Sequence, residues 1–237
     1  IGSGGLLSDH QLFNVDMEAG EQREMTREAL DIILKIWENQ GPSQYKGKFW
    51  NFNIPNPNDF EYGASFGPLG KVFRQPYQKP HPPIGVAAAS PHSETLKIAG
   101  ERGYIPMSLG LNAVYVASHW DAVEEGAKRV SREPPSRSQW RIVRDVWVAD
   151  TDSEAREQAL NGMLGRAWRE YLLPLVSFGP YPFLKYMKHD ESVPDEAVTP
   201  EYLMDHLWLV GSPDTVVRKI QELNESVGGF GTLLWLM

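Results

Sequence analysis

The segment from Ile84 to Thr95 combines an apolar run, two serines and a helix start. Residues 84–89 are apolar or small and predict a buried strand, and an amphipathic helix is expected over residues 94–102. Ser90 or Ser93 is expected to cap this helix. The free N–H groups and the positive dipole end of a helix start favour an anion. The pattern therefore predicts a phosphate site above the strand.

The elements that must position this site alternate along the chain. Helix 21–37 is the most regular, because its apolar residues recur every three or four positions. The other expected elements are strands 84–89, 105–109, 140–149 and 231–236 and helices 94–102, 112–130, 153–170 and 213–226. Residues 41–80 and 174–198 are expected to be irregular. The alternation predicts a parallel sheet covered by helices, as in a doubly wound sheet or a (β/α)₈ barrel. The barrel is favoured because no complete dinucleotide-binding glycine motif is present.

The composition of the chain argues against several kinds of binding partner. The chain has 237 residues, enough for one α/β domain, and a net charge of −8. Its basic residues are scattered, so no nucleic acid partner is expected. It contains no cysteine, which excludes disulfides and thiolate ligands, and its histidines show no metal-ligand spacing, so no metal is expected. No apolar run of membrane-spanning length and no signal-type segment is seen, which predicts a cytoplasmic protein without a membrane partner.

The two ends of the chain read as parts of strands. Residues 1–5 resemble the tail of a strand that enters a glycine turn, and residues 231–237 form an apolar strand pattern. Termini normally lie at the surface of a domain. We therefore expect residues 1–237 to form a single but incomplete barrel domain, without its earlier strands and its final helix.

Several motifs in a fixed order resemble the bacterial luciferase-like flavin-dependent monooxygenases. The motifs that carry the resemblance are Gly4–Asp9, Phe13–Asp16, Gln22–Asp31, Tyr45–Trp50, Ala88–Pro91, Ala99–Gly103 and Val210–Val216. Residues Val193–Leu203 further suggest the subgroup near limonene and alkanal monooxygenases. The resemblance covers nearly the whole chain. It implies a (β/α)₈ TIM barrel of the luciferase-like type, of which this chain represents the part from the end of strand 4 to strand 8.

The resemblance implies a two-component FMN-dependent monooxygenase. Such an enzyme receives reduced FMN from a separate flavin reductase and uses O₂ to insert one oxygen atom into an apolar alkanal, alkane or terpene. A homodimer or higher oligomer is implied as well. The alternatives are a deazaflavin-dependent hydride-transfer oxidoreductase, a non-catalytic flavin-binding protein, and a phosphate-binding barrel lyase or isomerase. No catalytic residue is assigned, because the family carries its candidates on the half of the barrel before residue 1.

The resemblance also implies which residues hold FMN. Polar donors to the phosphate are implied at Ser90 and Arg23. His92 and Ser93 lie in the same expected turn and are further candidate cofactor-binding residues. Small or apolar side chains that let the flavin approach closely are implied at Gly4, Leu6, Leu7, Ala88 and Ala89. Ordinary alternatives are a plain helix cap for Ser90, a solvated side chain for Arg23 and a surface position for His92. The aromatic segment 178–187 is implied as a wall of the substrate site, with a folded loop or a subunit contact as the alternative.

Overall fold

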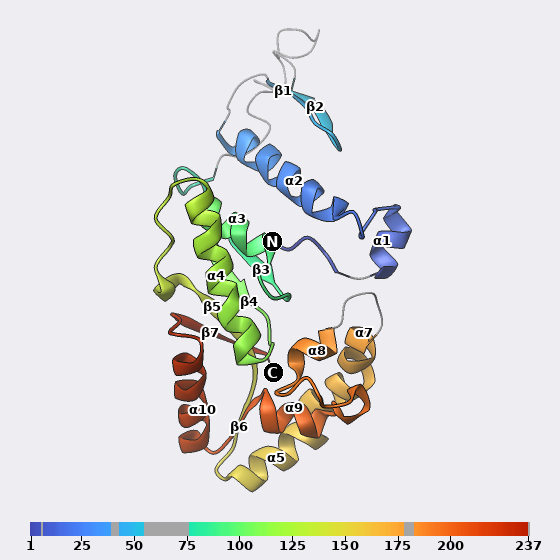
Figure 1. Ribbon diagram of the computed structural model, residues 1–237, viewed down its shortest axis with the longest axis vertical. Helices are drawn as coiled ribbons and strands as arrows, with labels where there is room; N and C mark the ends of the chain where they lie inside the picture. Colours follow the sequence, from blue (N-terminus) through green and yellow to red (C-terminus); the bar gives the residue numbers. More distant parts are fainter. Residues whose placement is uncertain (6, 39–42, 55–75, 178–182, 237) are drawn as a thin grey trace, which may run out of the picture. The chain divides into compact units, whose positions relative to one another are not determined.

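The computed structural model describes residues 1–5, 7–38, 43–54, 76–177 and 183–236 (Figure 1). The chain separates into two compact units, one formed by Ile1–Gly2 with Ile84–Met237 and a smaller one formed by Ser3–Pro83. The single domain expected over residues 1–237 stays a prediction. None of the described helices is both long and apolar enough to cross a membrane.

The larger unit contains a parallel sheet. Its strands are β3 (Gly85–Ala88), β4 (Ile105–Ser108), β5 (Arg141–Val148), β6 (Leu209–Gly211) and β7 (Thr232–Leu236). The strand order is β3-β4-β5-β6, and the longest strand, β5, pairs with β7 along residues 141–145 and with β6 along residues 146–148. The predicted α/β class with a parallel sheet is confirmed. All four predicted strands are present, each within one residue of its expected ends.

Ile1 extends this sheet beyond β3. Its amino group donates to the carbonyl of Gly85 at 2.7 Å, and its carbonyl accepts from the N–H of Ala87 at 2.9 Å. One residue that bonds to both neighbours of Val86 is the pattern of a parallel ladder. The interpretation of residue 1 as part of a strand therefore agrees with its hydrogen bonds to β3.

Helices α3 (Glu94–Arg102) and α4 (Ala113–Arg129) follow β3 and β4. They touch backbone to backbone because each has a glycine at the crossing. A Cβ atom at Gly100 would lie 1.9 Å from the carbonyl oxygen of Val123, and one at Gly126 would lie 1.9 Å from that of Lys97. No other residue fits at either position without separating the helices, so the two glycines allow α3 and α4 to pack in direct contact.

A second group of helices lies between β5 and β6: α5 (Asp152–Asn161), α6 (Met163–Ala167), α7 (Leu173–Ser177), α8 (Phe183–Met187) and α9 (Pro200–His206). They are coloured yellow to orange in Figure 1. An apolar core that includes Trp168, Leu203 and Trp208 lies among them. The single helix predicted over residues 153–170 is wrong in detail, because it breaks at Gly162 and a π-helical turn follows at Trp168–Leu172. The irregular structure predicted over residues 174–198 is also wrong in part, since α8 lies within it. After β6, α10 (Pro213–Ser226) follows as predicted.

The smaller unit contains α1 (Leu7–Phe13), α2 (Glu21–Glu38) and a hairpin of β1 (Ser43–Lys46) and β2 (Asn51–Ile54). The Glu28 carboxylate on α2 accepts hydrogen bonds from the backbone N–H groups of Lys48, Phe49 and Trp50 in the hairpin turn. Helix 21–37 was predicted almost to its ends. The expectation of loop over residues 41–80 is wrong at this hairpin, and residues 55–75 lie outside the described part of the chain.

Candidate phosphate site at the end of β3

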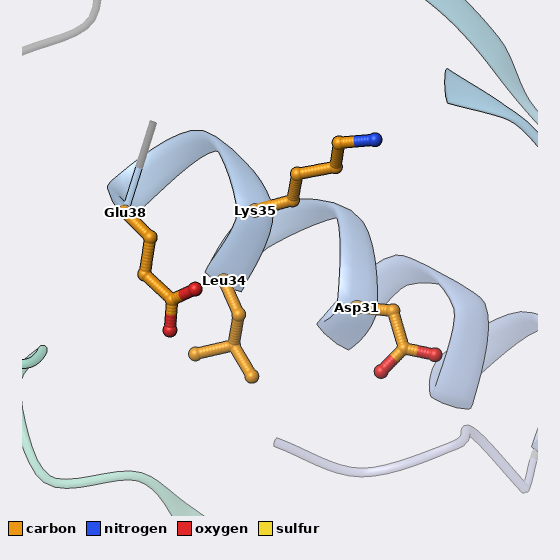
Figure 2. Close-up of a pocket in the computed structure, with 4 residues that line it drawn as sticks. All are labelled: Asp31, Leu34, Lys35 and Glu38. Atoms are coloured by element: carbon orange, nitrogen blue, oxygen red, sulfur yellow. The ribbon is translucent and has the colours of Figure 1, made fainter. Parts of the chain in front are cut away.

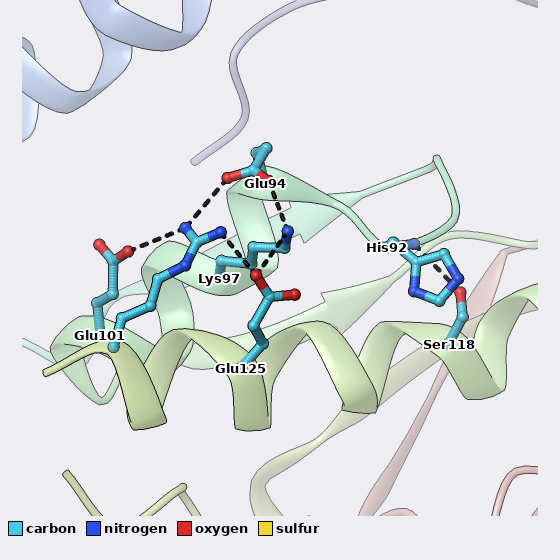
Figure 3. A network of polar contacts seen from close by, with 7 residues as sticks. His92, Glu94, Lys97, Glu101, Ser118 and Glu125 are labelled. Atoms are coloured by element: carbon cyan, nitrogen blue, oxygen red, sulfur yellow. Dashed lines mark hydrogen bonds and ion pairs between the residues drawn. The ribbon is translucent and has the colours of Figure 1, made fainter. Parts of the chain in front are cut away.

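The chain turns sharply between β3 and α3. The carbonyl of Ala88 at the end of β3 accepts from the N–H of Leu109, which fixes the start of the turn. His92 takes a left-handed conformation with φ of 48°, and its N–H donates to the Ser118 hydroxyl of α4 at 3.2 Å (Figure 3). Ser93 is the N-cap residue of α3, but its side chain does not bond to the helix. Of the two predicted caps, Ser93 is therefore correct by position.

This turn carries hydrogen-bond donors without acceptors. In the described part of the chain, the hydroxyls of Ser90 and Ser93 and the backbone N–H groups of Glu94 and Thr95 have no protein partner. Ser93 is buried and Ser90 is half-buried. Hydroxyls and first-turn N–H groups are the donors that bind phosphate at a helix start. The small residues Ala88 and Ala89 precede them. The donor set fits the phosphate end of a flavin nucleotide.

One carboxylate lies close to these donors and is neutralised. Glu94 begins α3, where a negative charge opposes an incoming anion, yet its oxygens contact Lys97 at 2.6 Å and Arg129 at 3.3 Å. Lys97 also contacts Glu125 on α4 at 3.0 Å (Figure 3). Hydrogen bonding from Lys97 holds the pKa of Glu94 below its ordinary value. The negative charge of Glu94 is therefore paired with cationic side chains of α3 and α4 and opposes an anion in the turn less strongly.

A buried chain of polar groups lies under the turn. The Nε2 atom of His119 on α4 is 2.9 Å from the carbonyl oxygen of Ser90, and its Nδ1 atom is 2.8 Å from the hydroxyl of Ser108 at the end of β4. The indole N–H of Trp140 donates to the same hydroxyl at 2.8 Å. All three side chains are fully buried.

The partners fix the tautomer of His119. A carbonyl only accepts, so Nε2 carries the hydrogen and donates to Ser90, and Nδ1 of the neutral ring accepts from Ser108. Burial lowers the pKa of His119 to about 4, which keeps the ring neutral at physiological pH. Sequence reasoning considered His119 only as a metal ligand. Its apolar neighbours Val116 and Trp120 at helical spacing were the available signal that it faces the core.

The structure brings together only part of the predicted set. Residues of the larger unit that meet in one turn are Ala88, Ala89, Ser90, His92 and Ser93. The others belong to the smaller unit: Arg23 is exposed on α2, Gly4 is exposed with φ of 77°, and Leu7 begins α1. Leu6 lies outside the described residues, as do residues 178–182 of the predicted substrate wall. The grouping of Arg23, Gly4 and Leu7 with the turn stays a prediction.

Two shallow depressions occur on the smaller unit and include none of the predicted residues. One lies on a single face of α2 and is lined by Asp31, Leu34, Lys35 and Glu38 (Figure 2). The other lies on the hairpin of β1 and β2. Among the described residues, no group of three or more His, Asp or Glu side chains is placed to hold a metal ion. The turn after β3 is therefore the stronger candidate for a ligand site.

Comparison with known proteins places the chain in a family. Residues 1–229 match the family described as luciferase-like monooxygenase. The chain is 33% identical over 223 residues to 3,6-diketocamphane 1,6-monooxygenase of Pseudomonas putida, covering 91% of this chain and 56% of that protein. It is 30% identical over 240 residues to limonene 1,2-monooxygenase of Rhodococcus erythropolis, covering 99% of this chain and 53% of that protein.

A solved structure agrees with these matches. It is the oxygenating constituent of 3,6-diketocamphane monooxygenase from Pseudomonas putida, described as a type II Baeyer-Villiger monooxygenase in complex with FMN. The TM-score is 0.81 at 28% identity, covering 100% of this chain and 63% of that one. The chain spans little more than half the length of the curated relatives it matches. The predicted resemblance and luciferase-like barrel fold are confirmed, and the chain belongs to the luciferase-like monooxygenase family.

Proposed function

We propose that this protein is the oxygenating component of a two-component, FMN-dependent monooxygenase. The observation that carries the proposal is the turn after β3, where the hydroxyls of Ser90 and Ser93 and the first N–H groups of α3 have no acceptor among the described residues. Support comes from the family match and from the FMN complex of the related oxygenating constituent. When bound, reduced FMN supplies the electrons that activate O₂.

The proposed roles of the residues concern binding and orientation. Ser90 and Ser93 donate to the phosphate together with the helix start, and Arg23 adds a guanidinium. His92, exposed at the tip of the same turn, is a further candidate donor. Ala88 and Ala89 leave room for the ribityl chain, while Gly4, Leu6 and Leu7 lie beside the flavin. No residue of this chain is proposed to exchange a proton with the substrate.

For the substrate we propose a cyclic terpenoid ketone. The relatives named above are diketocamphane and limonene monooxygenases, so alkanals and alkanes are the less favoured members of the predicted apolar class. In the proposed reaction one atom of O₂ enters the bond between the carbonyl carbon and its neighbour to give a lactone. The other atom leaves as water, and two electrons and two protons come from reduced FMN.

The remaining proposals concern the protein's partners, its oligomeric state and its cellular location. A separate flavin reductase supplies reduced FMN, and the protein forms a homodimer or a higher homo-oligomer. The cytoplasmic location stays a prediction. The deazaflavin-dependent alternative differs in its chemistry, because it transfers a hydride to or from the substrate and needs no oxygen.

The test uses the intact protein with chemically reduced FMN, ¹⁸O-labelled O₂ and a diketocamphane. We expect a lactone that carries one labelled oxygen atom, detected by mass spectrometry. Reduced deazaflavin without O₂ is the matched control and should give no product. Reduction of the ketone in that control, with no labelled lactone from FMN, would favour the hydride-transfer alternative and reject the monooxygenase.

A further inference from the structure

We propose that His119 is a positioning residue for the FMN phosphate, which it serves by holding the carbonyl of Ser90 from beneath the turn. The inference rests on the proposed function, since it assigns a task to a residue that would not touch FMN itself. His119 is buried and is not among the FMN-binding residues proposed above. The inference assigns it a role in supporting those residues.

The first argument is the chemistry of the Ser90 peptide. Residue 91 is proline, so the peptide that joins it to Ser90 has no N–H. The Ser90 carbonyl is then the only hydrogen-bonding group through which the protein can orient that peptide. The N–H at Nε2 of His119 binds this carbonyl at 2.9 Å. Fixing that peptide plane restrains the backbone at Ser90, from which the hydroxyl projects.

The second argument is that α4 holds the turn at two consecutive residues. Ser118 accepts the N–H of His92 at 3.2 Å, and His119 donates to the carbonyl of Ser90. These two contacts bracket Pro91, so the turn is tied to α4 on both sides of its proline. Helix α4 is also in backbone contact with α3, the helix that follows the turn, at Gly126.

The third argument is the order of the buried chain behind His119. Trp140 donates to Ser108, and this hydroxyl then has its own hydrogen to give to Nδ1 of His119. Trp140 only donates, Ser108 and His119 each accept one hydrogen bond and donate one, and the chain ends at the Ser90 carbonyl, which only accepts. The other tautomer, with the hydrogen on Nδ1, would place an unprotonated Nε2 against that carbonyl, which is repulsive. Ser108 and Trp140 therefore keep His119 in the tautomer that holds the turn.

The test compares FMN with riboflavin, which lacks only the phosphate. Dissociation constants of the intact protein and its variants are measured by flavin fluorescence. We expect His119→Leu to weaken FMN binding about tenfold, the effect of one lost hydrogen bond, and to leave riboflavin binding within about twofold. His119→Gln keeps an N–H at the Nε2 position and should retain most of the preference for FMN.

Val116→Ala is the matched control. Val116 is also fully buried on α4, one turn before His119, and has no polar contact with the turn. We expect this variant to lose stability while its ratio of riboflavin to FMN dissociation constants stays that of the wild type. A His119→Leu protein with the wild-type ratio would overturn the inference.

A measurement on the wild type keeps the inference testable if His119→Leu does not fold. In protein with ¹⁵N-labelled histidine, the Nε2 resonance of His119 should be that of a protonated nitrogen and should shift with FMN but not with riboflavin. An unprotonated Nε2, or no response to FMN, would also overturn it. If the wild type shows no preference for FMN over riboflavin, the phosphate site itself is wrong, and the failure belongs to the proposed function.

Discussion

Burial shifts the pKa values of two side chains of the larger unit in opposite directions. Burial lowers the pKa of His119 to about 4 from 6.5, with smaller contributions from His92 and Arg144. Burial raises the pKa of Asp145 on β5 to about 6 from 3.8, although the indole N–H of Trp168 donates to it at 3.2 Å. Below pH 6.5 the unfolded chain protonates His119 first, which costs stability. Below pH 6 the folded chain protonates Asp145 first, which restores it.

Because the two effects oppose each other, the pH dependence of wild-type stability does not reveal the contribution of His119. A comparison of the wild type with a His119 variant does. Because His119→Gln removes only the histidine, the stability advantage of the wild type over the variant should shrink by ~2 kcal/mol between about pH 7.5 and pH 5. Urea unfolding at the two pH values measures this difference, in which the other carboxylates cancel. Asp145→Asn is the control. The stability of the wild type relative to this variant should increase, not decrease, as the pH falls from about 7.5 to about 5. An advantage that is the same at both pH values would contradict a neutral, buried His119.

At the scale of elements, the crossing of α3 and α4 depends on Gly126. A methyl group there would lie 1.9 Å from the Lys97 carbonyl oxygen, so Gly126→Ala must separate the helices. We expect a loss of about 2 kcal/mol in the free energy of unfolding, as for other overpacked sites. Since α4 carries Ser118 and His119, the preference for FMN over riboflavin should fall as well. Urea unfolding and flavin binding measure the two effects, with exposed Asp121→Ala on α4 as a neutral control.

The elements that could be predicted were those with local signals. Helix α10 begins at Pro213 after the capping Ser212, whose hydroxyl accepts from the N–H of Thr215, and its predicted ends are the observed ones. The break at Gly162 was missed because a glycine inside a periodic pattern is compatible with a continuous helix. Strand β6 was missed because its three residues, Leu209, Val210 and Gly211, are too few to show a periodic pattern.

The candidate site was predictable only where it is local. Residues 88–93 follow one another in sequence, so their meeting in one turn follows from the strand, the serines and the helix start. The support beneath them is not local, because His119 lies 29 positions from Ser90 and Trp140 lies 32 positions from Ser108. Such contacts depend on which strands become neighbours in the sheet. A single sequence leaves that open, so His119 could be read as a core residue but not as a partner of the turn.

At the scale of the whole molecule, the proposed FMN residues come from both compact units. Arg23 lies on α2 of the smaller unit, and its assignment to the phosphate rests on the family resemblance. If that assignment is right, Arg23→Ala should weaken FMN binding about tenfold or more, because charged hydrogen bonds to a phosphate are the stronger ones. Riboflavin binding should stay within about twofold.

The control for Arg23 is Arg27→Ala, which removes another exposed arginine one turn later on the same helix. Both variants lose the same charge, so a general electrostatic effect would weaken FMN binding equally in the two. A loss confined to Arg23→Ala would indicate a direct contact with the phosphate. If Arg23→Ala binds FMN as the wild type does, while Ser90→Ala does not, the phosphate is held by the larger unit, and the role of Arg23 must be given up.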